Sequence, residues 1–127
     1  MKEKNVFLER EGYSPKNKVL DFLIVAQDFD YSLKEIAKYS EVSYPCIKQL
    51  KKELVKDKWI ILTRKVGRAQ MHKLNVKNPV VQKFIDYYWA VVEYVVEKEL
   101  GIKAKIHEED FKSSSSMKGL AVSARNV

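Results

Sequence analysis

Lysine and arginine are concentrated in one segment of this sequence, residues 44–73. Nine basic residues occur there against two acids, and the excess of seven equals the formal net charge of the whole 127-residue chain. The nine are Lys48, Lys51, Lys52, Lys56, Lys58, Arg64, Lys65, Arg68 and Lys73. A basic excess confined to one short segment is typical of a surface that binds a polyanion.

Residue types for other chemistry are scarce. The chain has one cysteine, Cys46, and two distant histidines, His72 and His107, so we expect no disulfide framework and no metal site. No nucleophile with a histidine and an acid, no phosphate-binding loop and no pair of catalytic carboxylates can be assembled. We therefore expect neither an enzyme nor a bound cofactor.

Hydropathy argues against a membrane protein. The most apolar stretch, residues 80–96, contains Lys83, Asp86 and Glu93 and is too polar and too short for a comfortable membrane span. The first residues lack the apolar core of a signal peptide. We expect a soluble cytoplasmic protein that associates with the nucleoid if its polyanion is DNA.

Caps and apolar spacing predict the elements that position these residues. Ser14-Pro15, Ser32 with Glu35, and Ser43 with Pro45 predict the starts of three helices, over 15–27, 32–40 and 44–57. Two β-branched runs, 59–65 and 71–76, predict a hairpin with its loop at 66–70. Asn78-Pro79 and Gly101 bound a long final helix. Residues 1–13 are expected to be an arm or a short added helix, and residues 102–127 a flexible tail.

This order resembles a known family. Residues 31–62 look like the core of a winged helix-turn-helix DNA-binding domain. Ile36 and Ala37 match the apolar-small pair of its first helix, Val42 follows the turn, and Ile47 and Leu50 match the buried side of the recognition helix. One departure is a glutamate, Glu41, where the family usually has glycine, which implies a positive-φ penalty or a different turn.

The resemblance implies a mainly α-helical fold with a small β-hairpin wing. Its DNA-binding domain would span residues 14–77, and residues 78–101 would form a long dimerisation helix. Together these parts resemble the small dimeric regulators of bacteria and archaea of the MarR, ArsR or PadR kind.

Physical reasoning assigns contacts to double-stranded DNA. The N-terminal turns of a helix in the major groove reach the base edges, and here these turns carry Ser43, Tyr44, Pro45, Cys46, Lys48 and Gln49. Phosphates would be met by Lys51, Lys52 and Lys56. The wing, residues 64–70, would contact the backbone or minor groove through Arg64, Lys65, Gly67 and Arg68, with Arg68 as the inserted side chain.

The helix from residue 78 to 101 is apolar on two sides. One stripe has the spacing of a helix-pairing seam, and we predict it as the dimer interface: Val81, Phe84, Tyr88, Val91 and Val95. A second band, with Ile85, Trp89, Val92 and Val96, would pack on the chain's own domain. The alternative is that the N-terminal arm covers one side. The aromatic residues of this helix could also line an effector pocket, but we favour core packing as their role: Tyr87, Tyr88, Trp89 and Tyr94.

The sequence therefore predicts a sequence-specific DNA-binding protein, a homodimeric transcriptional regulator. Two alternatives stay open. A DNA segregation protein of the plasmid-partition kind would bind a centromere-like site through the same parts. A winged-helix adaptor would dock its basic face on an acidic protein. Simpler interpretations also remain for single residues: Cys46 as a small apolar helix residue, and His72 as a structural residue.

Overall fold

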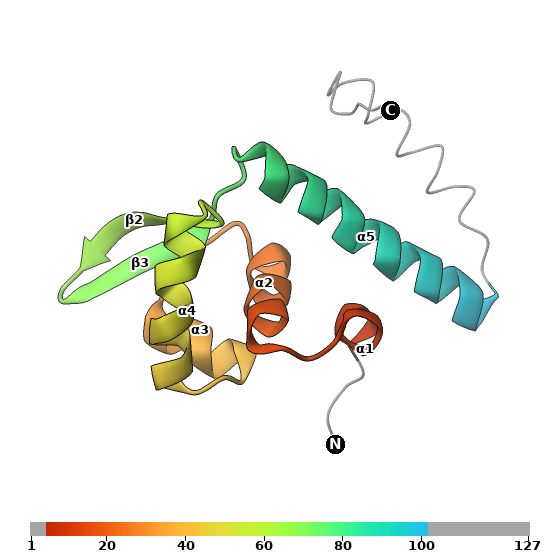
Figure 1. Cartoon of the computed structure of the whole chain (residues 1–127), viewed down its shortest axis with the longest axis horizontal. Coiled ribbons are helices and arrows are strands. Elements are labelled where there is room, and N and C mark those ends of the chain that lie inside the picture. Colours follow the sequence, from red (N-terminus) through yellow and green to blue (C-terminus); the bar gives the residue numbers. More distant parts are fainter. Residues whose placement is uncertain (1–4, 102–127) are drawn as a thin grey trace. The chain divides into compact units, whose positions relative to one another are not determined.

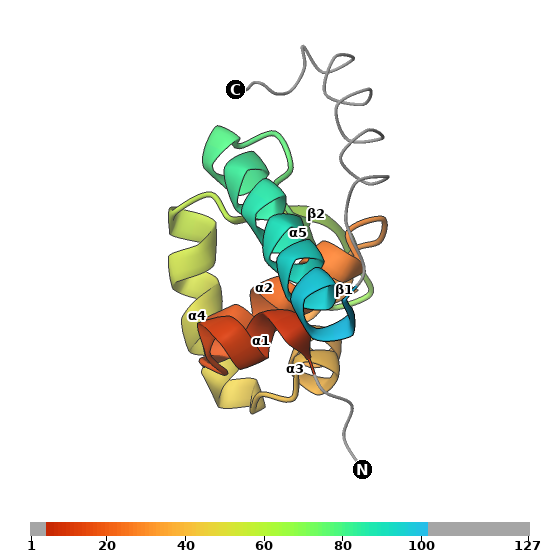
Figure 2. The same ribbon diagram turned by 90° about the vertical axis from the view of Figure 1, so that its right-hand side faces the viewer.

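The computed structural model describes residues 5–101, and the predicted tail lies outside the described residues. The elements are α1 (Val6–Glu11), α2 (Pro15–Val25), β1 (Tyr31–Ser32), α3 (Leu33–Ser40), α4 (Tyr44–Lys56), β2 (Ile60–Val66), β3 (Ala69–Leu74) and α5 (Pro79–Leu100) (Figure 1; β1 is labelled in Figure 2). The chain divides into two compact units, and the boundary between Ala90 and Val91 falls inside α5.

The predicted caps start the helices of the first unit. The Ser14, Ser32 and Ser43 hydroxyls accept bonds from the backbone N–H groups of Asn17, Glu35 and Cys46, at 3.1, 3.2 and 3.2 Å. The Glu35 carboxylate accepts from the Ser32 backbone N–H at 2.9 Å, which completes the capping box. All three predicted helices are confirmed, with ends shifted by one or two residues.

Two non-glycine residues hold left-handed conformations where helices end. Glu41 has φ 61° after α3, and Lys58 has φ 65° after α4. At each end the next residue bonds back into the last turn: Val42 N–H to Ala37 O at 3.0 Å, and Trp59 N–H to Leu54 O at 2.8 Å. These are Schellman bonds, which satisfy the last carbonyls of a helix. The sequence correctly singled out Glu41 as a positive-φ position.

The sheet has three antiparallel strands in the order β1-β3-β2. The sequence predicted no strand at β1. The hairpin is confirmed, but its turn is narrower than expected and consists of Gly67 and Arg68, with Gly67 at φ 63°. Ser32 and Arg64 both lie opposite Met71 of the central strand β3.

The core of the first unit lies between the helices and the base of the hairpin. Its fully buried side chains come from α2, α3, α4, β2 and β3: Val19, Leu20, Leu23, Ile24, Ile36, Ile47, Leu54, Ile60 and Leu74. Helices α3 and α4 pack on each other and on α2. Helix, tight turn, helix and a hairpin wing in this order form the winged helix-turn-helix fold that the sequence predicted.

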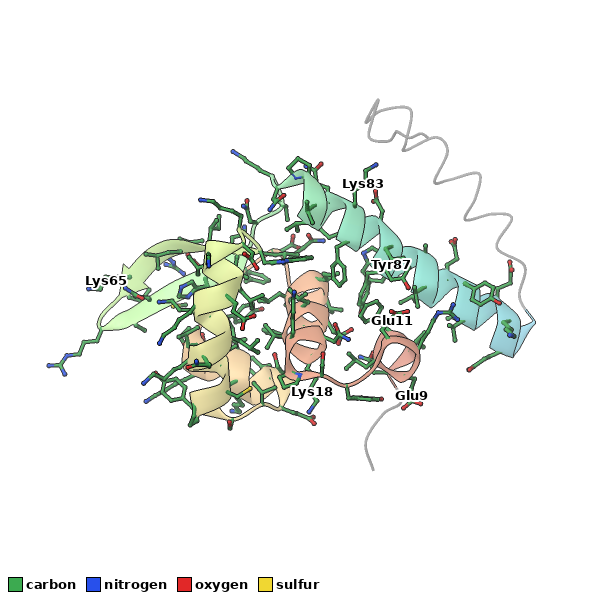
Figure 3. All side chains as sticks on the ribbon, viewed as in Figure 1. Glu9, Glu11, Lys18, Lys65, Lys83 and Tyr87 are labelled. Carbon is green, nitrogen blue, oxygen red and sulfur yellow. The ribbon has the colours of Figure 1, made fainter. Side chains whose placement is uncertain are left out.

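Helix α1 holds the start of α5 within the first unit. The Phe7 ring contacts the rings of Phe84, Tyr87 and Tyr88, at centroid distances of 5.8, 6.4 and 4.6 Å. The Tyr88 hydroxyl donates to Asp21 of α2 at 2.6 Å. Helix α1 packs on α2 and lies in front of it in Figure 2. Figure 3 shows the side chains of Tyr87 and Glu11 pointing toward each other.

This packing corrects the predicted dimer seam. Val81 is completely buried and Tyr88 is 4% exposed within one chain, so neither is open to a second copy. Phe84 lies between Phe7 and Trp59, whose ring centroid is 5.2 Å from its own. Conversely Trp89, assigned by sequence to the chain's own core, is 47% exposed. The alternative in which the N-terminal arm covers one side of the helix is the arrangement found. Val91 is likewise buried, at 6% exposed, and the role of Val95, which lies in the second unit, stays a prediction.

Candidate nucleic-acid interface

Helix α4 separates its apolar and basic residues onto different faces. Ile47 and Leu54 are buried against the core, each 1% exposed. The opposite face is exposed and carries Tyr44, Pro45, Lys48, Gln49, Lys52 and Lys56. Ile47, the half-buried Leu50 and Leu54 follow one another at spacings of three and four, which places them on one face of the helix. The first turns of α4 therefore present a row of polar side chains to solvent.

A shallow groove follows the N-terminal half of α4. Its walls bring together Tyr44, Pro45, Lys48, Gln49, Lys51 and Lys52. Six of the nine residues predicted on this helix thus share one surface. The other three do not line it. The Ser43 hydroxyl is occupied by its cap bond, Cys46 is partly buried, and Lys56 is exposed at the far end of the helix.

A second groove lies between the start of α3, the start of α4 and the wing. It is lined by Ser32, Lys34, Tyr44, Lys65, Arg68 and Gln70. The sequence had named three of these six. Lys34, Ser32 and Gln70 were missed because they lie outside the segment of basic excess or carry no charge, and only the packing of α3 against the wing brings them here. Three cations from two distant parts of the chain therefore converge on one groove.

Tyr44 lies on the border of the two grooves and lines both. Its ring has the Lys48 ammonium 5.4 Å from its centroid and the Lys34 ammonium at 6.0 Å. Contacts of this kind contribute about 0.5–1 kcal/mol each at exposed sites. Tyr44 therefore restrains one lysine of each groove, and it links α3 to α4 on the exposed side.

Two cations of the wing, Lys65 and Arg68, differ in their surroundings from the third, Arg64. Lys65 and Arg68 are exposed, and within residues 5–101 neither has a carboxylate at ion-pairing distance (Figure 3 labels Lys65). Arg64 is held by Asp30: Nε donates to Oδ2 at 2.9 Å and Nη2 donates to Oδ1 at 3.1 Å. The sequence grouped Arg64 with the DNA contacts and gave no signal for Asp30.

His72 lies beneath this surface, in the central strand, and is 1% exposed. Burial, and next the charge of Lys51, lower the pKa of its imidazole. Nδ1 has no hydrogen-bond partner within the part of the chain that the structure describes. His72 is therefore a neutral residue of the core and does not line either groove. This agrees with the structural role that the sequence analysis gave it.

Other kinds of site find no support among the described residues. No group of three or more His, Cys, Asp or Glu in residues 5–101 could hold a metal ion. None of the helices in this range combines the length and the hydropathy that a membrane span requires.

Comparisons with known proteins agree on the fold. No protein-family model and no curated protein matches this chain. MepR, a transcription regulator of the Staphylococcus aureus multidrug efflux pump MepA, is 14% identical, with 87% of this chain and 79% of that chain covered and a TM-score of 0.57. A mutant of S. aureus MepR bound to an oligodeoxyribonucleotide is 16% identical, with 87% of this chain and 80% of that chain covered and a TM-score of 0.56.

Two further solved structures have the same architecture. A mutant of Lactococcus lactis ZitR in apo form is 16% identical, with 81% of this chain and 80% of that chain covered and a TM-score of 0.56. The adhesin competence repressor AdcR from Streptococcus pyogenes is also 16% identical, with coverages of 80% and 76% and a TM-score of 0.54. These likenesses show a shared fold.

Proposed function

We propose that this protein is a sequence-specific double-stranded DNA-binding protein that acts as a homodimeric transcriptional regulator. One observation carries the proposal: six cations from α3, α4 and the wing line two adjoining grooves, and none of them has a carboxylate partner within residues 5–101. The six are Lys34, Lys48, Lys51, Lys52, Lys65 and Arg68. The fold is shared with MepR, ZitR and AdcR, whose structures include a transcription regulator, a repressor and an oligodeoxyribonucleotide complex.

Each part of the surface has a role in this proposal. Helix α4 enters the major groove, where Gln49 can pair with adenine and Lys48 with guanine. Lys51 and Lys52 meet phosphates, and the wing tip reaches the neighbouring backbone or minor groove through Arg68. If each protomer neutralises about four phosphates, the affinity of a dimer falls with salt with a logarithmic slope of about −7.

The homodimer is supported by exposed apolar side chains on α5. Val80, Tyr87, Trp89 and Tyr94 are 61%, 46%, 47% and 50% exposed. Val80, Tyr87 and Tyr94 recur every seven residues along one stripe, which is the repeat of a helix-pairing seam. This stripe is displaced by one residue from the predicted one. A two-fold dimer would bind an inverted repeat with half-sites about one helical turn apart.

The test is selection of bound fragments from a random or genomic DNA pool, followed by footprinting of the selected site. We expect a bounded footprint over an inverted repeat. An extended footprint that spreads along the DNA would indicate a segregation protein instead. No salt-dependent binding to any DNA would contradict the proposal and favour the adaptor.

Two variants link the site preference to α4. Lys48→Ala with Gln49→Ala should reduce the ratio of affinities for selected and unrelated DNA more than it reduces the affinity for unrelated DNA. Lys83→Ala is the matched control, because it removes one exposed charge from α5, outside both grooves (Figure 3). An unchanged ratio in the double variant would mean that α4 does not read the site.

A further inference from the structure

Arg64 and Asp30 form a two-bond ion pair partway along the wing, at the pair Arg64–Met71 of the strand ladder. The two N–H groups that face the carboxylate donate to different oxygens, at 2.9 and 3.1 Å. The Thr63 hydroxyl donates to the same carboxylate. The side chain of Asp30 is 14% exposed, whereas that of Arg64 is 62% exposed. A sheltered acid therefore holds an arginine that lies on the surface of the wing.

The pair is ionised at every pH at which the protein would bind DNA. The hydrogen bonds from Arg64 and next from Thr63 lower the pKa of the Asp30 carboxyl to about 2. The same bond from Asp30 raises the pKa of Arg64. The guanidinium charge is thus cancelled within the domain, in contrast to the charges of Lys65 and Arg68.

The geometry of this pair is the geometry of a phosphate contact. A guanidinium binds a carboxylate or a phosphate through the same fork of parallel N–H groups. The Nε and Nη2 groups of Arg64 that would approach a DNA phosphate already face Asp30. The fork formed by Nε and Nη2 can take a phosphate only by leaving the Asp30 carboxylate unpaired in a sheltered position, which costs part of the energy gained. The other N–H groups of Arg64 can still face a phosphate, but Asp30 already offsets the charge that would attract it.

The pair also spans the sheet. Arg64 lies on β2 opposite Met71 of the central strand, and Asp30 immediately precedes β1 on the other side of that strand. The ion pair therefore ties the two outer segments together across β3. The strand β2 is therefore fixed at Arg64, and only Lys65, Val66 and the turn extend beyond the pair.

We propose that Asp30 is a positioning residue of the DNA interface that occupies Arg64 in place of a phosphate. The cations of the wing that meet DNA are then Lys65 and Arg68. Each protomer makes one phosphate contact fewer than it would with Arg64 unpaired, which lowers the affinity for DNA of any sequence. This inference rests on the proposed function, since it concerns the same surface and the same partner.

The test compares the salt dependence of binding to a DNA duplex of mixed sequence, from about 50 to 200 mM salt. With Asp30 present, Arg64→Ala should leave the logarithmic slope unchanged. Asp30→Ala should make the slope steeper by about one per protomer, because Arg64 then reaches a phosphate. The double variant should return the slope to that of the wild type. Across this fourfold range of salt, one contact corresponds to about a 3-fold change in affinity per protomer.

Arg68→Ala is the matched control, because the same type of residue lies on the same wing and has no carboxylate partner within residues 5–101. It should make the slope shallower by about one per protomer with or without Asp30. A purely structural role for Asp30 would lower affinity without steepening the slope. The inference is overturned if Arg64→Ala alone makes the slope shallower by one, or if Asp30→Ala leaves the slope unchanged.

Two provisions keep the result decisive. If Asp30→Ala fails to fold, as judged by thermal unfolding, Asp30→Asn replaces it, because the amide retains an oxygen for Thr63 and removes the charge. If the wild type binds the duplex but the Arg64 variants depart from expectation, only this inference fails. If the wild type does not bind DNA, the proposed function fails and this inference fails with it.

Discussion

The turn between α3 and α4 permits a sharp test, because its central residue holds a conformation that suits glycine. Glu41 has φ 61° and ψ 45°. The left-handed conformation costs a residue with a Cβ roughly 1–2 kcal/mol, whereas glycine adopts it freely. Glycine also gains about 0.5–1 kcal/mol of conformational freedom in the unfolded chain, which offsets part of this advantage.

We therefore expect Glu41→Gly to raise the free energy of unfolding by about 0.5–1 kcal/mol, or Tm by roughly 2–8 °C. Two bonds at the turn involve atoms that the substitution keeps. The Val42 N–H still donates to Ala37 O, and the Lys18 ammonium still donates to the backbone oxygen of residue 41, at 3.0 and 3.3 Å in the present structure. The site preference for DNA should not change, since α4 keeps its position.

Glu41→Ala is the control, because it removes the same carboxylate and keeps the backbone penalty. Thermal and urea unfolding should place the glycine variant above the alanine variant by about 1 kcal/mol. Lys58→Gly, at φ 65° after α4, should be stabilising for the same reason. Equal stability of the glycine and alanine variants at position 41 would refute the argument from backbone strain.

Four further outcomes follow from burial and charge. Phe7→Ala should lower the free energy of unfolding by about 3 kcal/mol in urea, at the low end for a buried phenylalanine because α1 can detach. Tyr88→Glu should destabilise the protomer, as measured by circular dichroism. If the variant is instead a folded monomer, Tyr88 belongs to the dimer interface predicted from sequence. Lys34→Ala should make the salt slope of DNA binding shallower by about one per protomer, while Lys56→Ala, outside both grooves, should leave it nearly unchanged. The lowered pKa of His72 means that the folded state binds its proton less readily than the unfolded state, so stability should fall as pH drops through 6.5, and His72→Gln should flatten that decline in Tm.

Local signals predicted the fold well, because they act over one or two helical turns. Ser32 and Glu35 form a capping box within four residues, and Ser43 caps α4 through a residue three positions on. The spacing of three and four between apolar residues on α4 predicted that Ile47 is buried and Lys48 exposed. By contrast β1 has two residues, Tyr31 and Ser32, which are too few to show the period of a strand.

The faces of α5 could not be assigned from sequence, because two apolar stripes lie on the same helix. Heptad spacing fits Val81, Phe84 and Tyr88 as a seam, but the same side chains fit a core of the chain's own. The choice depends on α1, whose Phe7 lies far away in sequence and covers this stripe. Periodicity predicts that a face of the helix is buried. Which segment covers that face depends on the packing of parts of the chain that are distant in sequence.

The same limit applies to charge. The basic segment at residues 44–73 contains nine cations, but only five of them line the two grooves. Arg64 is cancelled by Asp30, which lies outside the segment, and Lys34 joins the grooves from outside it. An acid that pairs with a cation within the domain offsets most of that cation's contribution to the surface potential. A polyanion-binding surface is therefore defined by which cations lack an internal carboxylate, and that property depends on the fold.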